Sequence, residues 1–132
     1  MTFSPAAYQT ISRFFEDTGF DPVSYDMIFT GDLGNIGHEI LKNLLIENNI
    51  NVSKNLDDCG CMIFDSKSQG TKAGGSGCGC IASVFCGHFL PAFINKKIKR
   101  GLFVATGALM SPTTCGQGKP IIGIAHGVII EN

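Results

Sequence analysis

Two glycine-rich segments set the strongest limit on what this chain can fold into. Residues 30–37 read TGDLGNIG, and residues 73–79 read AGGSGCG. Each stands between an apolar stretch suited to a strand and a stretch with apolar residues at helical spacing. The order of strand, glycine-rich turn and helix is typical of α/β proteins.

The spacing of apolar residues predicts the order helix, strand, helix, strand, helix, strand, strand. The first helix begins at Ser4-Pro5, where a capping hydroxyl precedes a proline, and Gly19 ends it. Pro91 should kink the third helix, because proline lacks the N–H that a helix interior needs. The other predicted helices run through residues 36–45 and 81–93, and the strands cover residues 27–29, 61–64, 102–106 and 121–130.

These elements predict an α/β layered domain with a largely buried mixed sheet. We expect residues 1–132 to form a single domain. The last strand should be central, yet the sequence stops with it. A second half is therefore expected to complete the fold.

Charge and composition exclude several classes of protein. Ten Lys and Arg residues stand against eleven Asp and Glu residues, for a net charge of -1, so no positive field is available to attract nucleic acid. With 44% hydrophobic and 16% charged residues, the chain is not expected to be disordered. Neither a signal peptide nor an apolar run of about 18 residues is visible, so we expect no transmembrane segment.

The chain has six cysteines, Cys59, Cys61, Cys78, Cys80, Cys86 and Cys115. Without a secretion signal they are expected to be reduced thiols packed as small apolar side chains. Cys-Gly-Cys occurs twice, but paired ligands of structural zinc mostly have about two to four residues between them. We therefore expect no metal site, and we expect the third helix to bury Cys80 and Cys86.

The three histidines give no catalytic pattern. We expect His38 on a helix surface, His88 packed or half-exposed, and His126 buried and hydrogen-bonded in an apolar strand. None has the spacing to a Cys or Ser that nucleophilic catalysis would need. The residues by themselves predict no catalytic group.

The two glycine-rich turns allow two interpretations. Free backbone N–H groups and the positive ends of helix dipoles attract anions, and ligands of open α/β sheets gather beyond the carboxyl ends of strands. The hydroxyl-rich residues 111–114 could add to such a pocket. Alternatively, the glycines only permit close packing of helix on sheet. Two such turns in one chain favour a ligand pocket modestly.

The first turn also resembles the dinucleotide-binding turn of extended short-chain dehydrogenases, with Thr-Gly-x-x-Gly-x-x-Gly after a strand. Here a helix precedes that strand, and Asp57-Asp58 come before the next predicted strand rather than at its end. The Tyr-x-x-x-Lys pair of those enzymes is missing. A dinucleotide site is thus a weak alternative. A Walker loop is excluded, because residues 74–80 lack the Lys-Ser/Thr ending.

Six stretches of the chain together resemble the C-terminal half of the stage V sporulation protein AD family, which consists of thiolase-like proteins of spore-forming bacteria. They are residues 5–8 (PAAY), 25–34 (YDMIFTGDLG), 58–63 (DCGCMI), 73–80 (AGGSGCGC), 105–112 (ATGALMSP) and 124–131 (IAHGVIIE). The resemblance implies a thiolase-like half-domain of a fold with two similar halves. A missing N-terminal half or a second copy of the chain would then be its partner.

The resemblance also implies a function. The family binds dipicolinic acid (pyridine-2,6-dicarboxylate), usually with calcium, without catalysis, for uptake into the developing spore. By the same resemblance, this protein would lie peripherally on the cytoplasmic side of the forespore or spore inner membrane, beside other stage V sporulation membrane proteins. No other cofactor is implied.

The same resemblance bears on the site residues. It implies that the His and Asn of the thiolase superfamily are replaced here at about Asp32 and Gly75, and that the nucleophilic Cys would belong to the missing half. A thiolase-like or ketoacyl-synthase-like acyltransferase, completed by a separate N-terminal half, is therefore the alternative function. Asp32 could face a cation or donate while protonated. The predicted ligand-binding residues are Asp32, Gly75, Ser76, Gly77, Ser111 and Thr113.

Overall fold

The computed structural model of the protein describes residues 3–109 and 111–132. Its centre is a four-stranded sheet in the order β2-β1-β3-β4. The strands are β1 (Met27–Thr30), β2 (Leu56–Asp58), β3 (Arg100–Leu109) and β4 (Ile122–Glu131). The first three are mutually parallel, and β4 is antiparallel to β3. The predicted mixed sheet is confirmed.

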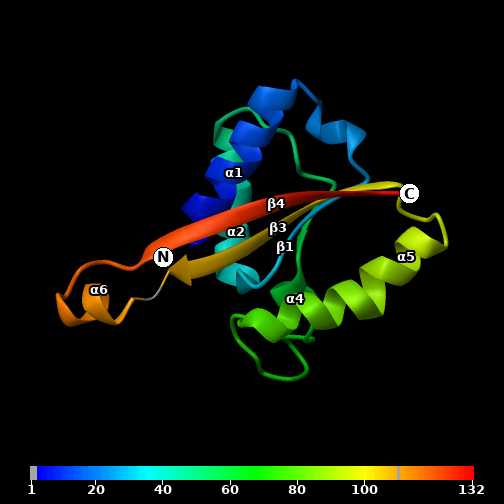
Figure 1. Ribbon diagram of the computed structural model, residues 1–132. Coiled ribbons are helices and arrows are strands. Elements are labelled where there is room, and N and C mark those ends of the chain that lie inside the picture. Colours follow the sequence, from blue (N-terminus) through cyan, green and yellow to red (C-terminus); the bar gives the residue numbers. More distant parts are fainter. Residues whose placement is uncertain (1–2, 110) are drawn as a thin grey trace.

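Helices cover both faces of this sheet (Figure 1). On one face lie α1 (Phe3–Thr18) and α2 (Gly34–Glu47). On the other face lie α4 (Cys78–Val84), the π-helical turn η2 (Phe85–Phe89) and α5 (Leu90–Ile94). The described residues also form three short elements: η1 (Pro22–Ser24), α3 (Cys59–Met62) and α6 (Pro112–Gly116). The α/β layered architecture is as predicted.

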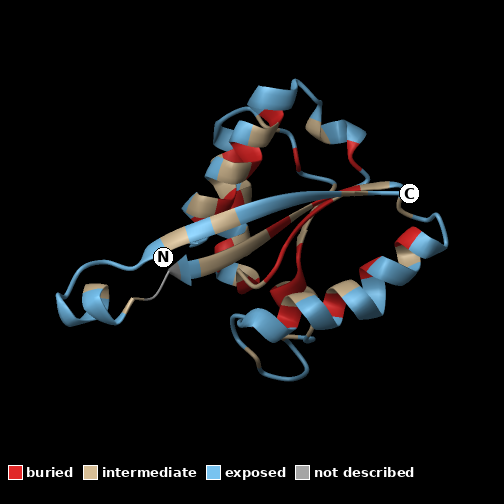
Figure 2. Ribbon diagram, viewed as in Figure 1, coloured by how far each residue is buried: buried red, intermediate tan, exposed pale blue. Residues whose placement is uncertain are grey.

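Two apolar clusters hold the layers together, because successive residues of a strand point to opposite faces. Ile28 packs with Ile11 and Leu41 of the first helix layer. Its neighbour Phe29 packs with Phe89 of η2, the ring centroids being 4.1 Å apart and the rings nearly parallel. Figure 2 shows the buried residues along β1 and along the inner sides of the helices.

The helix interruption expected at Pro91 takes the form of a π turn. The N–H of Leu90 donates to the carbonyl of Phe85, five residues back, immediately before the proline. The helical path continues directly into α5, whose second residue is Pro91, a residue that has no N–H to donate.

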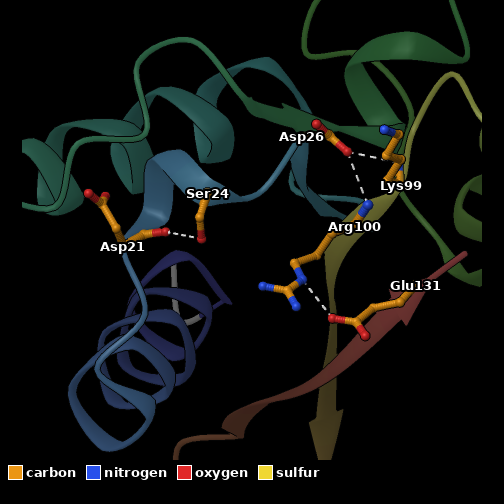
Figure 3. A network of polar contacts seen from close by, with 6 residues as sticks. All are labelled: Asp21, Ser24, Asp26, Lys99, Arg100 and Glu131. Carbon is orange, nitrogen blue, oxygen red and sulfur yellow. Dashed lines mark hydrogen bonds and ion pairs between the residues drawn. The ribbon is translucent and has the colours of Figure 1, made fainter.

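Polar contacts tie together the amino ends of β1 and β3 (Figure 3). One carboxylate oxygen of Asp26 accepts from the backbone N–H groups of Lys99 (2.8 Å) and Arg100 (3.0 Å). These hydrogen bonds, led by that of Lys99, hold the pKa of Asp26 below its usual range. The Arg100 side chain pairs with Glu131 at 2.6 Å. This end of the sheet is therefore closed by the protein's own groups.

The prediction of a strand at residues 61–64 was wrong. The strand is β2, Leu56–Asp58, and the chain then turns at once into α3. The cause is Asp58, whose side chain accepts from the N–H of Cys61 and so caps a helical turn. Residues 111–118, expected as a plain loop, contain the short helix α6.

Strand β4 also differs from the prediction, which placed the last strand in the centre of the sheet. Instead of being central, β4 is the last strand of the sheet in the described chain. Ile122 and Val128 are 63% and 54% exposed on it. His126, expected to be buried, is exposed on the same strand, as Cys86 is on η2. The reason is shared: the described chain supplies no layer to cover these positions.

Candidate functional site

A cavity of about 390 Å³ opens between the carboxyl-end half of β3 and the start of α4. Ligand pockets of proteins begin at about 300 Å³, so the cavity has room for one small molecule. Small and apolar groups make up most of its wall, with hydroxyl, thiol and carboxylate groups at a few points. The lining residues are Phe3, Asp32, Ser76, Gly77, Cys78, Ile81, Ala105, Thr106, Gly107 and Ala108.

Asp32 joins three parts of this cavity. Its Oδ2 accepts from the backbone N–H of Gly77 at 3.0 Å, and its Oδ1 accepts from the Thr106 hydroxyl at 3.0 Å. The Gly77 amide, expected to be free for a ligand, is thus taken by a side chain of the protein. Asp32 also helps to raise the pKa of Cys80, although burial of that thiol is the larger cause.

Asp58, which is not among the predicted site residues, fills the first glycine-rich turn, residues 30–37. Asp58 is fully buried and accepts from the backbone N–H groups of Leu33 (3.0 Å) and Gly34 (2.9 Å). It also accepts from the Thr30 hydroxyl (2.6 Å) and the Cys61 N–H (3.2 Å). The expectation that the first turn offers free amides to an anion was wrong, because this carboxylate already occupies them. The signal available in the sequence was an Asp three residues before Cys61, which is the spacing of a helix cap.

Gly75 is a packing residue. Its N–H donates to the Gly60 carbonyl at 2.6 Å. A Cβ at this position would lie 2.5 Å from Ile63 Cγ2 and 2.8 Å from Cys80 Sγ, so a side chain does not fit. At Gly75, the structural interpretation of the glycines is therefore the correct one.

The remaining predicted residues divide into two groups. Ser76 is exposed and lines the cavity, together with Asp32 and Gly77. Ser111 and Thr113 are not among the lining residues, because they belong to the segment of α6 that follows β3. In Figure 1 this segment projects away from the body of the molecule. Thr106 and Cys78 line the cavity without having been predicted.

The cysteines are free thiols in different environments. Cys59 and Cys80 are buried, whereas Cys78, Cys86 and Cys115 are exposed, so they are only in part small core residues. Burial, followed by the charge of Asp58, raises the pKa of both Cys59 and Cys61 to about 12. Such thiols stay protonated at neutral pH and are poor nucleophiles and metal ligands. Among the described residues, no three His, Cys, Asp or Glu side chains gather as metal ligands would.

Fold and cavity together define an α/β layered domain with room for one small ligand between its sheet and a helix. The chain belongs to the family described as Stage V sporulation protein AD (SpoVAD), whose sequence model matches residues 1–131. It is 43% identical over 128 residues to Stage V sporulation protein AD of Bacillus subtilis (strain 168). The predicted family resemblance is thereby confirmed, and the chain is a member of a sporulation protein family.

That match covers 97% of this chain and 38% of the relative. The chain therefore spans well under half of the length of the curated protein it resembles. None of the helices in the described ranges is long and apolar enough to cross a membrane.

Proposed function

We propose that the chain takes part in non-catalytic binding of dipicolinic acid for its uptake into the developing spore. The observation that carries the proposal is the cavity beside Asp32, in a chain that belongs to a sporulation protein family. Hydroxyl groups of Ser76 and Thr106 suit the carboxylates of such a ligand. The Ile81 side chain and the alanines of β3 suit a flat aromatic ring.

The charge of the cavity decides whether dipicolinate would bind as the free dianion or as its calcium chelate. Asp32 is negative, and the residues that line the cavity include no Lys, Arg or His in the part of the chain described. A free dianion would meet uncompensated repulsion there. The calcium chelate of dipicolinate is neutral, and calcium prefers carboxylate oxygens as ligands. We therefore take calcium as part of the cargo, bound with the ligand.

Two other functions fit the contacts less well. An acyltransferase would need a base beside a nucleophile, and the Cys78 thiol meets no imidazole in the described wall of the cavity. Dinucleotide binding would need the amides of the first turn, which Asp58 occupies. An acyl group that is transferred from acyl-CoA, stays attached after denaturation and is located by mass spectrometry would support the acyltransferase function.

Membership of a sporulation protein family and the uncovered strand β4 support a proposal for where the protein acts and what it binds. We place the protein peripherally on the cytoplasmic side of the forespore or spore inner membrane, with other stage V sporulation membrane proteins. The exposed Ile122, Ile124 and Val128 would be covered by an N-terminal half or by a second copy of the chain. A thiolase-like fold of two halves would supply such a cover.

Calorimetric titration of dipicolinate, with and without equimolar calcium, tests the binding proposal. The chain is titrated alone and mixed with the part of the Bacillus subtilis relative that it does not cover. Saturable binding is expected in the titration with calcium, and Ser76→Asp should abolish it, because a second negative charge is added to the cavity. Ser83→Asp, at an exposed position on α4 outside the cavity wall, is the matched control and should bind normally. No heat in either preparation would contradict the proposal.

A further inference from the structure

Asp32 holds two donors of the cavity in a way that a ligand could reproduce. Its two carboxylate oxygens are each 3.0 Å from a donor, one the Gly77 N–H and the other the Thr106 hydroxyl. The donors come from different elements, the loop before α4 and the middle of β3. A slot for one planar carboxylate group is thus already built, and the protein's own side chain fills it.

The position of Asp32 would allow a ligand to displace its carboxylate from the two donors. The side chain is half-exposed at the end of β1, unlike Asp58, which is fully buried with four donors around it. Its partners both line a cavity of about 390 Å³, so a small molecule can approach them. No cation of the described cavity wall neutralises Asp32. A ligand carboxylate that approaches would therefore find both donors already bonded to Asp32, and it would be repelled by the negative charge of Asp32.

We propose that Asp32 is the specificity-determining residue of this cavity, because a ligand carboxylate binds only by taking the Gly77 and Thr106 donors from it. Ligands that bring a cation relieve the repulsion, and the displaced Asp32 carboxylate can then face that cation. Free carboxylates are disfavoured, because they must displace Asp32 without that compensation. This inference rests on the proposed function for the identity of the ligand, but the slot itself can be tested without dipicolinate.

The first experiment tests the slot with formate as the probe. Asp32→Ala removes the internal carboxylate and leaves the two donors open to a small one. Formate at about ten times its Kd should raise the melting temperature of this variant by about 4 °C more than chloride at equal ionic strength. The wild-type chain should show no such difference. Asp65→Ala is the matched control, since Asp65 also accepts from backbone N–H groups but lies exposed in a loop outside the cavity wall. Equal responses of all three proteins would overturn the inference.

The second experiment tests the competition with dipicolinate in calcium-free buffer. Asp32→Asn keeps the size of the side chain, so dipicolinate binding can be measured with this variant even if Asp32→Ala does not fold. It removes the charge and one acceptor, and we expect dipicolinate to bind at least about tenfold more tightly than to the wild type. Asp65→Asn makes the same change of net charge and should bind like the wild type.

The two experiments separate failure of the inference from failure of the proposed function. Equal or weaker dipicolinate binding by Asp32→Asn overturns the role of Asp32, even if the wild type binds. Formate rescue of Asp32→Ala with no dipicolinate binding by any protein supports the carboxylate slot and contradicts the proposed ligand.

Discussion

Asp58 is the side chain on which the first glycine-rich turn depends. It is fully buried and accepts four hydrogen bonds, three of them from residues 30–37 and one from Cys61 in α3. A buried carboxylate is tolerated only where such donors replace water. Its contacts therefore explain why the first turn serves the structure of the protein rather than a ligand.

We predict that Asp58→Asn lowers the free energy of unfolding by about 2–4 kcal/mol, because the new amide group turns a donor toward backbone N–H donors. Urea denaturation followed by circular dichroism measures the loss. Asp57→Asn is the matched control, since Asp57 is only half-buried and accepts one hydrogen bond, from the N–H of Asp58. A loss no larger for Asp58→Asn than for the control would contradict this role.

The packing role of Gly75 gives a second prediction. A methyl group there would lie 2.5 Å from Ile63 Cγ2, so Gly75→Ala should cost about 1–3 kcal/mol of stability. At Gly79, in α4, nothing lies within 4 Å of the added Cβ, and Gly79→Ala should leave stability unchanged or raise it by up to about 1 kcal/mol. Thermal unfolding of the two variants compares them directly, and equal effects would argue against the close packing at Gly75.

The thiols give a prediction of pH dependence. Burial raises the pKa of Cys61 to about 12, so only about one such thiol in ten thousand is ionised at pH 8. Although Cys61 is half-exposed, we expect iodoacetamide to modify it far more slowly than the exposed Cys78, and its rate to rise with pH up to about 12. Peptide mass spectrometry after timed labelling measures both rates. Equal labelling of the two thiols at pH 8 would show that the Cys61 pKa is not raised.

At the scale of elements, η2 joins the helix layer to the sheet. Phe89 is fully buried, and its ring stacks on Phe29 of β1. We predict that Phe89→Ala costs about 3–5 kcal/mol in unfolding free energy, because a cavity is left between helix and sheet. The neighbouring Leu90→Ala, at a side chain 39% exposed, should cost less than half as much. Chemical denaturation of both variants tests the difference.

Local patterns predicted most of the elements, because helices and strands depend on spacing within a few residues. Helix α1 begins and ends where Ser4-Pro5 and Gly19 indicate, within a residue or two. The strand predicted at residues 61–64 failed, since apolar spacing could not reveal that Asp58 caps the chain there into α3. Short apolar runs of this kind fit a strand or a helical turn equally well.

The candidate site was harder to predict than the elements, because its members meet only through the fold. Asp32 and Thr106 are 74 residues apart in sequence, yet they share a hydrogen bond. Ser76 and Gly77 of the second glycine-rich turn line the cavity. The turns' sequence pattern did not reveal the bonds that fill them. That pattern could not show which amides are already bound to Asp32 and Asp58, since those partners come from other elements.

At the scale of the whole molecule, the sheet is covered unevenly. The chain spans 38% of its curated relative, and β4 leaves Ile122, Ile124 and Val128 exposed along one strand. Figure 2 shows that β4 is mostly exposed along its course, whereas β1 is buried. Apolar side chains gathered on an edge strand mark a surface that associates with another chain or segment.

We therefore predict that the chain alone self-associates as its concentration rises, and that Ile124→Lys with Val128→Lys reduces this association. Charged side chains on an edge strand oppose both pairing and apolar contact. Sedimentation velocity over a range of concentrations measures the self-association. The matched control is Ile46→Lys, at a 47% exposed position on α2. The double variant should also bind the uncovered part of the Bacillus subtilis relative more weakly than the control does. If the control weakens both associations as much, general apolar exposure rather than β4 governs them, and the partner surface must be sought on another layer of the fold.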